Sequence, residues 1–191
     1  NDQASTGDRD YTLGYPDHVI NEGDPIEGGE IRVGVVTDTP WKGIFSSTHS
    51  SDGLNNNLLI PMAGSLLATD ENYQLVGGEE YGAAANIEFD EEAKTVTITV
   101  REGVNWHDGE PVTADDIVFA YEIIGHKDYQ GVRYDDDMMN VVGMEEYHNG
   151  GADTISGLTL SDDQLTLTIQ YKEFTPNMKS SGGGVGTCLL Y

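Results

Sequence analysis

Two segments with strict period-two alternation restrict the fold of this chain most strongly. Residues 87–100 alternate apolar residues first with acids and then with threonines, and Asp90–Ala93 separates the two halves. Residues 158–169 repeat the arrangement around Ser161–Asp163. β-Branched residues in this pattern, joined by short acidic turns, are typical of β-hairpins. Because an isolated hairpin is only marginally stable, we expect the two ribbons to share one sheet or to pack on the same helices.

The segment between the ribbons, GVNWHDGEPVTADDIVFAYEII (residues 103–124), predicts a turn followed by a helix. Thr113 and Asp116 have the spacing of a capping pair, and an acid in the first turn is favoured by the helix dipole. Gly125 follows the helix and suits its C-terminal cap. Four apolar residues recur at helical spacing and should form the buried stripe: Ile117, Ala120, Tyr121 and Ile124.

Two further elements are expected before the first ribbon. Ile31, Val33 and Val35 alternate with smaller or charged residues, which predicts a strand that ends at Thr37–Pro40. Leu54, Leu58, Met62 and Leu66 recur every fourth residue, which favours a helix. Since proline costs about 3 kcal/mol in a helix interior, Pro61 predicts a kink or a late start, and Asp70–Asn72 then predicts a turn.

The net charge of the chain indicates which classes of partner it can bind. Nine basic residues face 34 acidic ones, a formal net charge of −25 over 191 residues. Such a surface repels phosphate, so we expect no nucleic-acid partner, and the scattered acids indicate mainly a strongly solvated exterior. No apolar run approaches the roughly 18 residues that span a bilayer. The single cysteine, Cys188, allows no disulfide within the chain.

The residues favour neither a catalytic nor a metal site. The side chains of His107 and Asp108 are neighbours in sequence and diverge, whereas a catalytic pair must lie within hydrogen-bond reach. Asp108–Gly109 is a common turn pair, with Trp106 anchoring the turn to the core. Asp135–Asp137 lacks the ligand alternation and the glycine of a calcium loop. We therefore expect no catalytic residues, no metal and no cofactor.

The segment 103–124 strongly resembles a signature of the bacterial extracellular solute-binding proteins of family 5. In that family a strand ends in an aromatic residue, Asp-Gly follows, and Thr-Ala-Asp/Glu-Asp opens a helix. The matching residues here are Trp106, Asp108, Gly109 and Thr113–Asp116. GGEIRVGVV, LLATDENYQLV and GLTLSDDQLTLTIQYKEFTPNM resemble further parts of the family, so that the resemblance covers roughly residues 28–178.

The resemblance implies the mixed α+β fold of class II periplasmic binding proteins, here the β-rich small subdomain of the N-terminal lobe. It implies a non-enzymatic substrate-binding component of an ABC importer, located outside the cell membrane. The expected partners are an oligopeptide ligand, held mainly through its main chain, and the transporter permease. Membrane attachment is expected only through a lipid anchor that this chain does not carry.

Members of the family are longer, so we expect an N-terminal fragment with a flexible leader (1–27), a lobe portion (28–178) and a flexible or truncated tail (179–191). The loop after the first expected strand should leave the lobe towards the cleft. Its residues are the candidate ligand contacts: Thr37, Asp38, Thr39 and Trp41.

Three alternatives remain open at this point. A nickel- or haem-binding member of the same family would share these motifs. A cell-surface adhesion module would need an exposed aromatic patch, and a hydrolase would need His107 as its base. The tyrosines that could form the patch are Tyr11, Tyr15, Tyr134, Tyr147 and Tyr171.

Overall fold

The computed structural model describes residues 28–30, 32–44, 46, 48–50, 52–59, 64–181 and 189–190, and the chain divides into two compact units, residues 1–36 and 37–191. The helices and strands given below all belong to the second unit. The expected leader 1–27 lies outside the described residues, as does most of the expected tail. The domain boundaries at 27/28 and 178/179 therefore stay predictions.

The first expected strand is not formed by its described residues. Residues 32–37 belong to neither helix nor strand, and Ile31 lies outside the described residues. Val33 and Val36 are 79% and 104% exposed. A strand is held by hydrogen bonds to a neighbouring strand, and within the described residues no strand pairs with this segment. The strand prediction is therefore wrong for residues 32–36.

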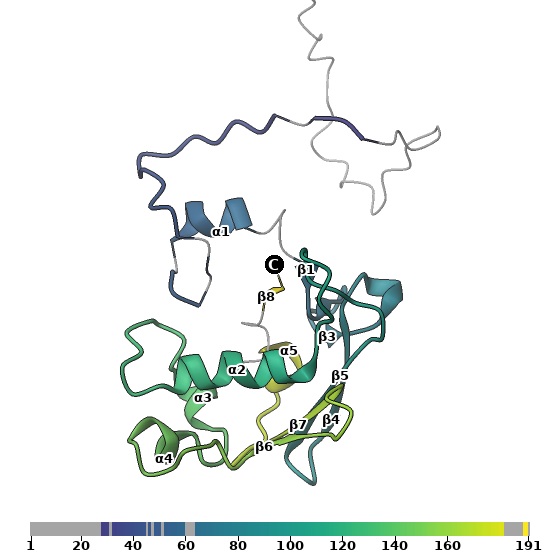
Figure 1. Cartoon of the computed structure of the whole chain (residues 1–191), viewed down its shortest axis with the longest axis vertical. Coiled ribbons are helices and arrows are strands. Elements are labelled where there is room, and N and C mark those ends of the chain that lie inside the picture. Colours follow the sequence, from purple (N-terminus) through teal and green to yellow (C-terminus); the bar gives the residue numbers. More distant parts are fainter. Residues whose placement is uncertain are drawn as a thin grey trace, which may run out of the picture. The chain divides into compact units, whose positions relative to one another are not determined.

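Both predicted ribbons are confirmed, and they share one sheet. β4 (Ala85–Asp90) pairs with β5 (Thr95–Val100), and β6 (Leu158–Leu160) pairs with β7 (Thr166–Gln170). β5 and β7 join the two hairpins, so that the described residues contain a four-stranded antiparallel sheet in the order β4-β5-β7-β6 (Figure 1).

The period-two alternation separates the two faces of this sheet. Val96, Ile98 and Val100 of β5 are buried, while the threonines between them are half-buried on the opposite face. There the hydroxyls of Thr97 and Thr168 lie 3.5 Å apart across β5 and β7. One face of the sheet is thus apolar and must be buried against another element, and the other face presents hydroxyl groups.

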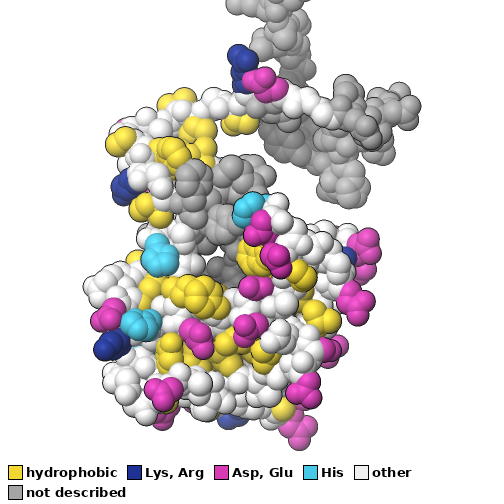
Figure 2. Space-filling view, in the orientation of Figure 1, with side chains coloured by type: hydrophobic (Ala, Val, Ile, Leu, Met, Phe, Trp, Pro, Cys, Tyr) yellow, Lys and Arg dark blue, Asp and Glu magenta, His cyan; other side chains and the backbone are white. Residues whose placement is uncertain are grey.

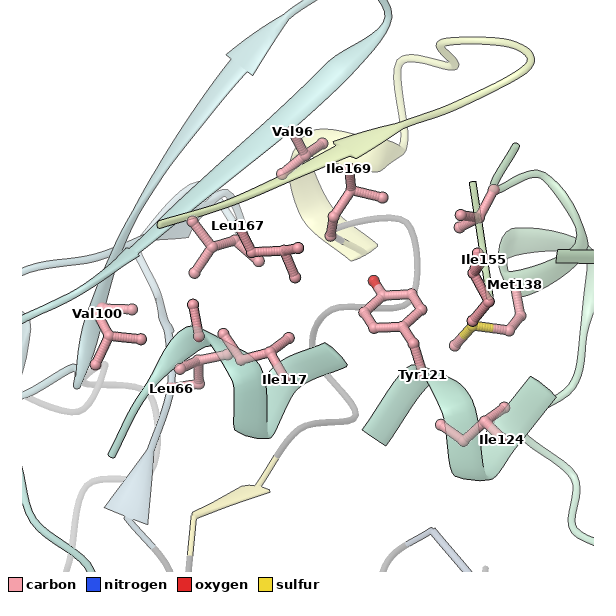
Figure 3. Close-up of a cluster of buried hydrophobic side chains, with 14 of the residues drawn as sticks. Leu66, Val96, Val100, Ile117, Tyr121, Ile124, Met138, Ile155, Leu167 and Ile169 are labelled. Carbon is pink, nitrogen blue, oxygen red and sulfur yellow. The ribbon is translucent and has the colours of Figure 1, made fainter. Parts of the chain in front are cut away.

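The cover is α2 (Ala114–Gly125), which packs on β5, β6 and β7 (Figure 1). Ile117 and Tyr121 point from the helix towards the sheet (Figure 3), and Ile124 belongs to the same buried core. Ala120, the fourth residue of the predicted stripe, is only half-buried. The helix and its apolar face are therefore confirmed, with a narrower stripe than the spacing predicted.

The predicted role of Gly125 as the C-terminal cap is wrong. Gly125 is the last residue of α2, and His126 caps the helix in an extended conformation. A Cβ at Gly125 would lie 2.6 Å from the sulfur of Met144 and 3.1 Å from the ring of Tyr147. Glycine is needed here because α4 (Met144–His148) packs closely against α2.

The predicted helix over Leu54–Leu66 is shorter in the structure. α1 spans Gly53–Leu59, and Met62 lies outside the described residues. Leu66 is buried but follows β1 (Gly64–Ser65), which pairs with β8 (Leu189–Leu190). Pro61, where a kink or a late start was predicted, also lies outside the described residues, so that this prediction stays open.

The predicted turn at Asp70–Asn72 joins β2 (Ala68–Thr69) to β3 (Leu75–Val76). The Asp70 carboxylate accepts hydrogen bonds from the backbone of Asn72 and Gln74, both at 2.8 Å. Three short elements without a sequence prediction complete the fold: η1 (Glu79–Tyr81), α3 (Asp136–Met139) and α5 (Met178–Ser181). Among the described residues, no helix has the length and apolar character to cross a bilayer.

Candidate functional site

The loop Thr37–Trp41 keeps all four candidate ligand contacts together. The Thr37 hydroxyl accepts a hydrogen bond from the Thr39 backbone at 3.1 Å, and the Thr39 hydroxyl donates to the Asp38 carboxylate at 3.2 Å. Thr37 and Asp38 are exposed, and Trp41 leaves 48% of its surface accessible. The threonines thus order the turn, while a carboxylate and an indole face solvent.

The loop is tied to the start of α1. Lys42 Nζ lies 3.4 Å from the carboxylate of Asp52, which accepts hydrogen bonds from the backbone of Leu54 at 3.0 Å and Asn55 at 3.3 Å. The Asn55 hydrogen bond contributes most to lowering the pKa of Asp52, and Lys42 and Leu54 lower it further. An ionised Asp52 therefore caps α1 and holds the end of the loop.

Two asparagines of α1 are functional candidates that the sequence analysis missed. Asn55 is 1% exposed, and its amide nitrogen donates to the Ser50 hydroxyl at 3.0 Å. The side-chain oxygens of Asn55 and Asn56 are buried and have no hydrogen-bond partner among the residues that the structure describes. An unsatisfied buried acceptor costs about 1–3 kcal/mol, so these oxygens are suited to accept N–H groups. The sequence feature that could have identified them is the run of three asparagines, Asn55–Asn57, between the regularly spaced apolar residues Leu54 and Leu58.

The segment His107–Glu110 forms the predicted turn. The Gly109 backbone donates to the Trp106 carbonyl at 3.0 Å, and Gly109 has a φ of 94° that favours glycine. The Asp108 carboxylate accepts from the Glu110 backbone at 3.1 Å. Asp108 is therefore engaged by the turn itself, and His107 is exposed beside it.

The turn is fastened to α2 through one carboxylate. Asp116 Oδ2 accepts hydrogen bonds from the Thr113 backbone at 2.8 Å, from the Thr113 hydroxyl at 3.3 Å and from Trp106 Nε1 at 3.3 Å. This is the predicted capping box with Asp in the usual place of Glu. Trp106 also packs against the core, so the whole corner is a rigid support.

A pocket of about 250 Å³ lies between β1 and this corner, lined among others by Arg101, Asn105 and His107. Arg101 Nε donates to the Ala83 carbonyl at 2.7 Å, and its guanidinium lies 3.9 Å from the Glu79 carboxylate. The arginine therefore supports the backbone before β4 and is not a freely available anion ligand.

The aromatic patch of the adhesion alternative is not formed by the described tyrosines. Tyr171 is 1% exposed, and Tyr134 and Tyr147 are partly buried against the core. Tyr11 and Tyr15 lie outside the described residues. The surface expected for that alternative is thus absent from the described part of the chain.

The run Asp135–Asp137 forms the N-cap and the first turn of helix α3. The Asp135 carboxylate accepts a hydrogen bond from the Met138 backbone at 3.1 Å and caps the helix. Over the described residues, no group of three or more His, Cys, Asp or Glu side chains is arranged to hold a metal ion.

The chain is similar to curated oligopeptide-binding proteins. It is 38% identical over 152 residues to the oligopeptide-binding protein OppA of Lactococcus lactis subsp. lactis, which covers 78% of this chain and 25% of the relative. It is 30% identical over 111 residues to the oligopeptide-binding protein AppA of Bacillus subtilis, covering 58% of this chain and 19% of that protein. The chain spans about a quarter or less of the length of these curated relatives.

Solved structures show the same fold. Lactococcal OppA, complexed with an endogenous peptide in the closed conformation, matches with a TM-score of 0.70 at 36% identity, over 78% of this chain and 28% of that chain. OppA of Haemophilus influenzae, in complex with the peptide RPPGFSPFR, matches with a TM-score of 0.58 at 20% identity, over 76% and 28% of the two chains. The predicted mixed α/β fold, part of a periplasmic binding protein with an antiparallel sheet, is confirmed.

The family model described as bacterial extracellular solute-binding proteins, family 5 Middle, matches residues 78–182, which is more than half of the chain and includes the sheet and α2. The capped turn and the two ribbons, which carried the resemblance in the sequence, lie within this match. The chain therefore belongs to the family 5 bacterial extracellular solute-binding proteins.

Proposed function

We propose that this chain is part of the substrate-binding component of an ABC importer, which captures oligopeptides outside the cell membrane and delivers them to a permease. The observation that carries this proposal is the 36% identity and TM-score of 0.70 to lactococcal OppA complexed with a peptide. The role is one of binding without catalysis, and the full-length protein is attached to the membrane by a lipid anchor.

Within this proposal, Thr37, Asp38, Thr39 and Trp41 contact the ligand. Three features support the assignment: the loop is exposed, its end is fixed to α1 through Lys42 and Asp52, and its indole offers a rigid apolar surface. An extended peptide needs main-chain hydrogen-bond partners, and the exposed backbone of the ordered loop supplies both donors and acceptors.

A chimera tests the function. Residues 28–178 replace the corresponding segment of lactococcal OppA, and peptide binding is measured by calorimetry. We expect affinity within about tenfold of the parent, since this segment supplies the scaffold and the loop contacts. A correctly folded chimera that binds no peptide would contradict the proposal.

Single substitutions in the chimera test the loop. Trp41→Ala should weaken peptide binding by about tenfold or more, because the aromatic contact with the ligand is lost. Tyr81→Ala is the matched control, since Tyr81 is also 48% exposed but lies in η1. Equal effects of the two substitutions would remove the loop from the binding site.

A further inference from the structure

A second pocket, with a volume of about 360 Å³, lies along the outer face of α2. Phe119 and Ile123 of the helix form one side, and Tyr129 and Tyr147 form much of the rest. Phe119 is 61% exposed, which is unusual for a phenylalanine in the middle of a helix. In Figure 2, hydrophobic side chains lie over α2 with histidines and acidic side chains beside them.

The walls of the pocket are connected by specific contacts. The Tyr129 hydroxyl donates to the Thr48 carbonyl, and the ring of His49 meets that of Tyr129 edge-on, with centroids 5.9 Å apart. The Tyr129 backbone also donates to the His126 carbonyl at 2.9 Å. Residues 48–49 are therefore held against the segment after α2, so that the pocket is preformed rather than a gap between loose loops.

Two acidic side chains line the pocket together with two histidines, His49 and His126. Glu122 and Asp128 are the acidic ones, and none of the described residues that line the pocket is a lysine or arginine. Asp128 lies 3.8 Å from His126 Nδ1. Glu122 is half-buried and, within the described residues, makes no ion pair or side-chain hydrogen bond. A partly desolvated carboxylate beside apolar groups is costly unless a cation or a donor reaches it.

The pKa of a neighbouring tyrosine also reflects the negative charge of Glu122. Burial raises the pKa of the Tyr147 hydroxyl, and the negative charge of Glu122 raises it further. The carboxylate of Glu122 is therefore close enough to Tyr147 for its negative charge to affect the side of the pocket that this ring forms. Aromatic ring faces attract organic cations, and the apolar side chains fit an alkyl stem.

We infer that this pocket binds an alkyl cation of the kind carried by lysine and arginine side chains. The alkyl stem packs on Phe119 and Ile123, the tyrosine rings flank the charged group, and Glu122 neutralises it. The volume is at the lower end for ligand pockets and suits one long side chain. The inference goes beyond the proposed peptide binding, because the described lining residues include none of the loop Thr37–Trp41.

The 191-residue chain can be tested directly with two small probes. Nα-acetyl-lysine methylamide carries the ammonium group, whereas Nα-acetyl-norleucine methylamide has a similar stem without the charge. Binding is followed by NMR through the ring resonances of Phe119, Tyr129 and Tyr147. We expect saturable shifts with the lysine probe and roughly tenfold weaker binding of the norleucine probe. Equal affinities would show a purely apolar pocket and overturn the inference.

Substitutions separate the pocket from general attraction to an acidic protein. Glu122→Gln keeps the size of the side chain and should weaken lysine binding by about tenfold, while Phe119→Leu should weaken it about threefold by removing a ring. Glu88→Gln on β4 is the control, because Glu88 is exposed and lies outside the pocket. Far-UV circular dichroism checks that each variant folds. If Glu88→Gln weakens binding as much as Glu122→Gln, or if Glu122→Gln has no effect, the inference is wrong.

Discussion

Residues 32–36 and residues 95–100 carry the same kind of alternating apolar pattern, but only the second segment is a strand. Val96, Ile98 and Val100 are at most 1% exposed, whereas Val33 and Val36 lie almost fully in solvent. β5 has hydrogen-bonded neighbours on both sides, β4 and β7, and α2 covers its apolar face. Alternation thus marks the capacity to form a strand, and partners elsewhere in the chain decide whether it forms.

The largest expected effect tests this contrast directly. Ile98→Ala should lower the free energy of unfolding by about 2–5 kcal/mol, because it leaves a cavity between the sheet and α2. Val33→Ala should change it by less than about 0.5 kcal/mol, because the side chain is exposed. Urea unfolding, monitored by tryptophan fluorescence, measures both values.

Ile98→Val provides a graded control if Ile98→Ala fails to fold, with an expected loss of about 0.5–1.5 kcal/mol. A loss above about 1 kcal/mol for Val33→Ala would show that residues 32–36 pack in solution, and the contrast between the two segments would then disappear.

Two glycines differ in how much space surrounds them, one beside the four-stranded sheet and the other in α1. A Cβ at Gly157 would lie 2.6 Å from the Val142 carbonyl oxygen and 2.9 Å from that of Gln170, and both are backbone atoms that cannot move easily. Gly157→Ala should therefore cost about 1–3 kcal/mol. Gly53→Ala, at the first residue of α1 with open space around it, should be neutral or stabilise by up to about 1 kcal/mol. Thermal unfolding measures the stability of both variants. A larger loss of stability for Gly53→Ala than for Gly157→Ala would show that Gly157 is not the more crowded position.

The smallest expected effect concerns the turn between β6 and β7. The Ser161 hydroxyl and the Leu165 backbone donate to the Asp163 carboxylate and lower its pKa below the usual 3.8. A carboxyl with a lower pKa in the folded chain stabilises the fold when ionised. Its contribution is complete above the pKa of 3.8 in the unfolded chain and is lost as the pH falls through the folded value.

Asp163→Asn should therefore lower the melting temperature slightly at pH 7, and the difference from the parent chain should shrink as the pH falls below 3.8. Melting curves of both proteins from neutral to acidic pH measure this convergence. A difference that stays constant, or grows, in acid would show that the carboxylate does not act through these hydrogen bonds.

The candidate site was less predictable than the sheet. The exposed loop Thr37–Trp41 could be proposed because it follows a motif of the family, whereas the buried oxygens of Asn55 and Asn56 could not. The pocket beside α2 joins Phe119 to His49 and Tyr147, residues far apart in sequence. A pattern in one segment contains no information about which distant segment will pack against it.

The two ribbons, the Trp106 turn and the capped start of α2 follow from the sequence alone, because period-two alternation, turn residues and capping pairs act between near neighbours. The tertiary structure was needed to show that residues 32–36 form no strand and that Gly125 lies where α4 packs closely against α2. These outcomes depend on hydrogen-bond partners and close contacts between distant segments, which no local pattern specifies.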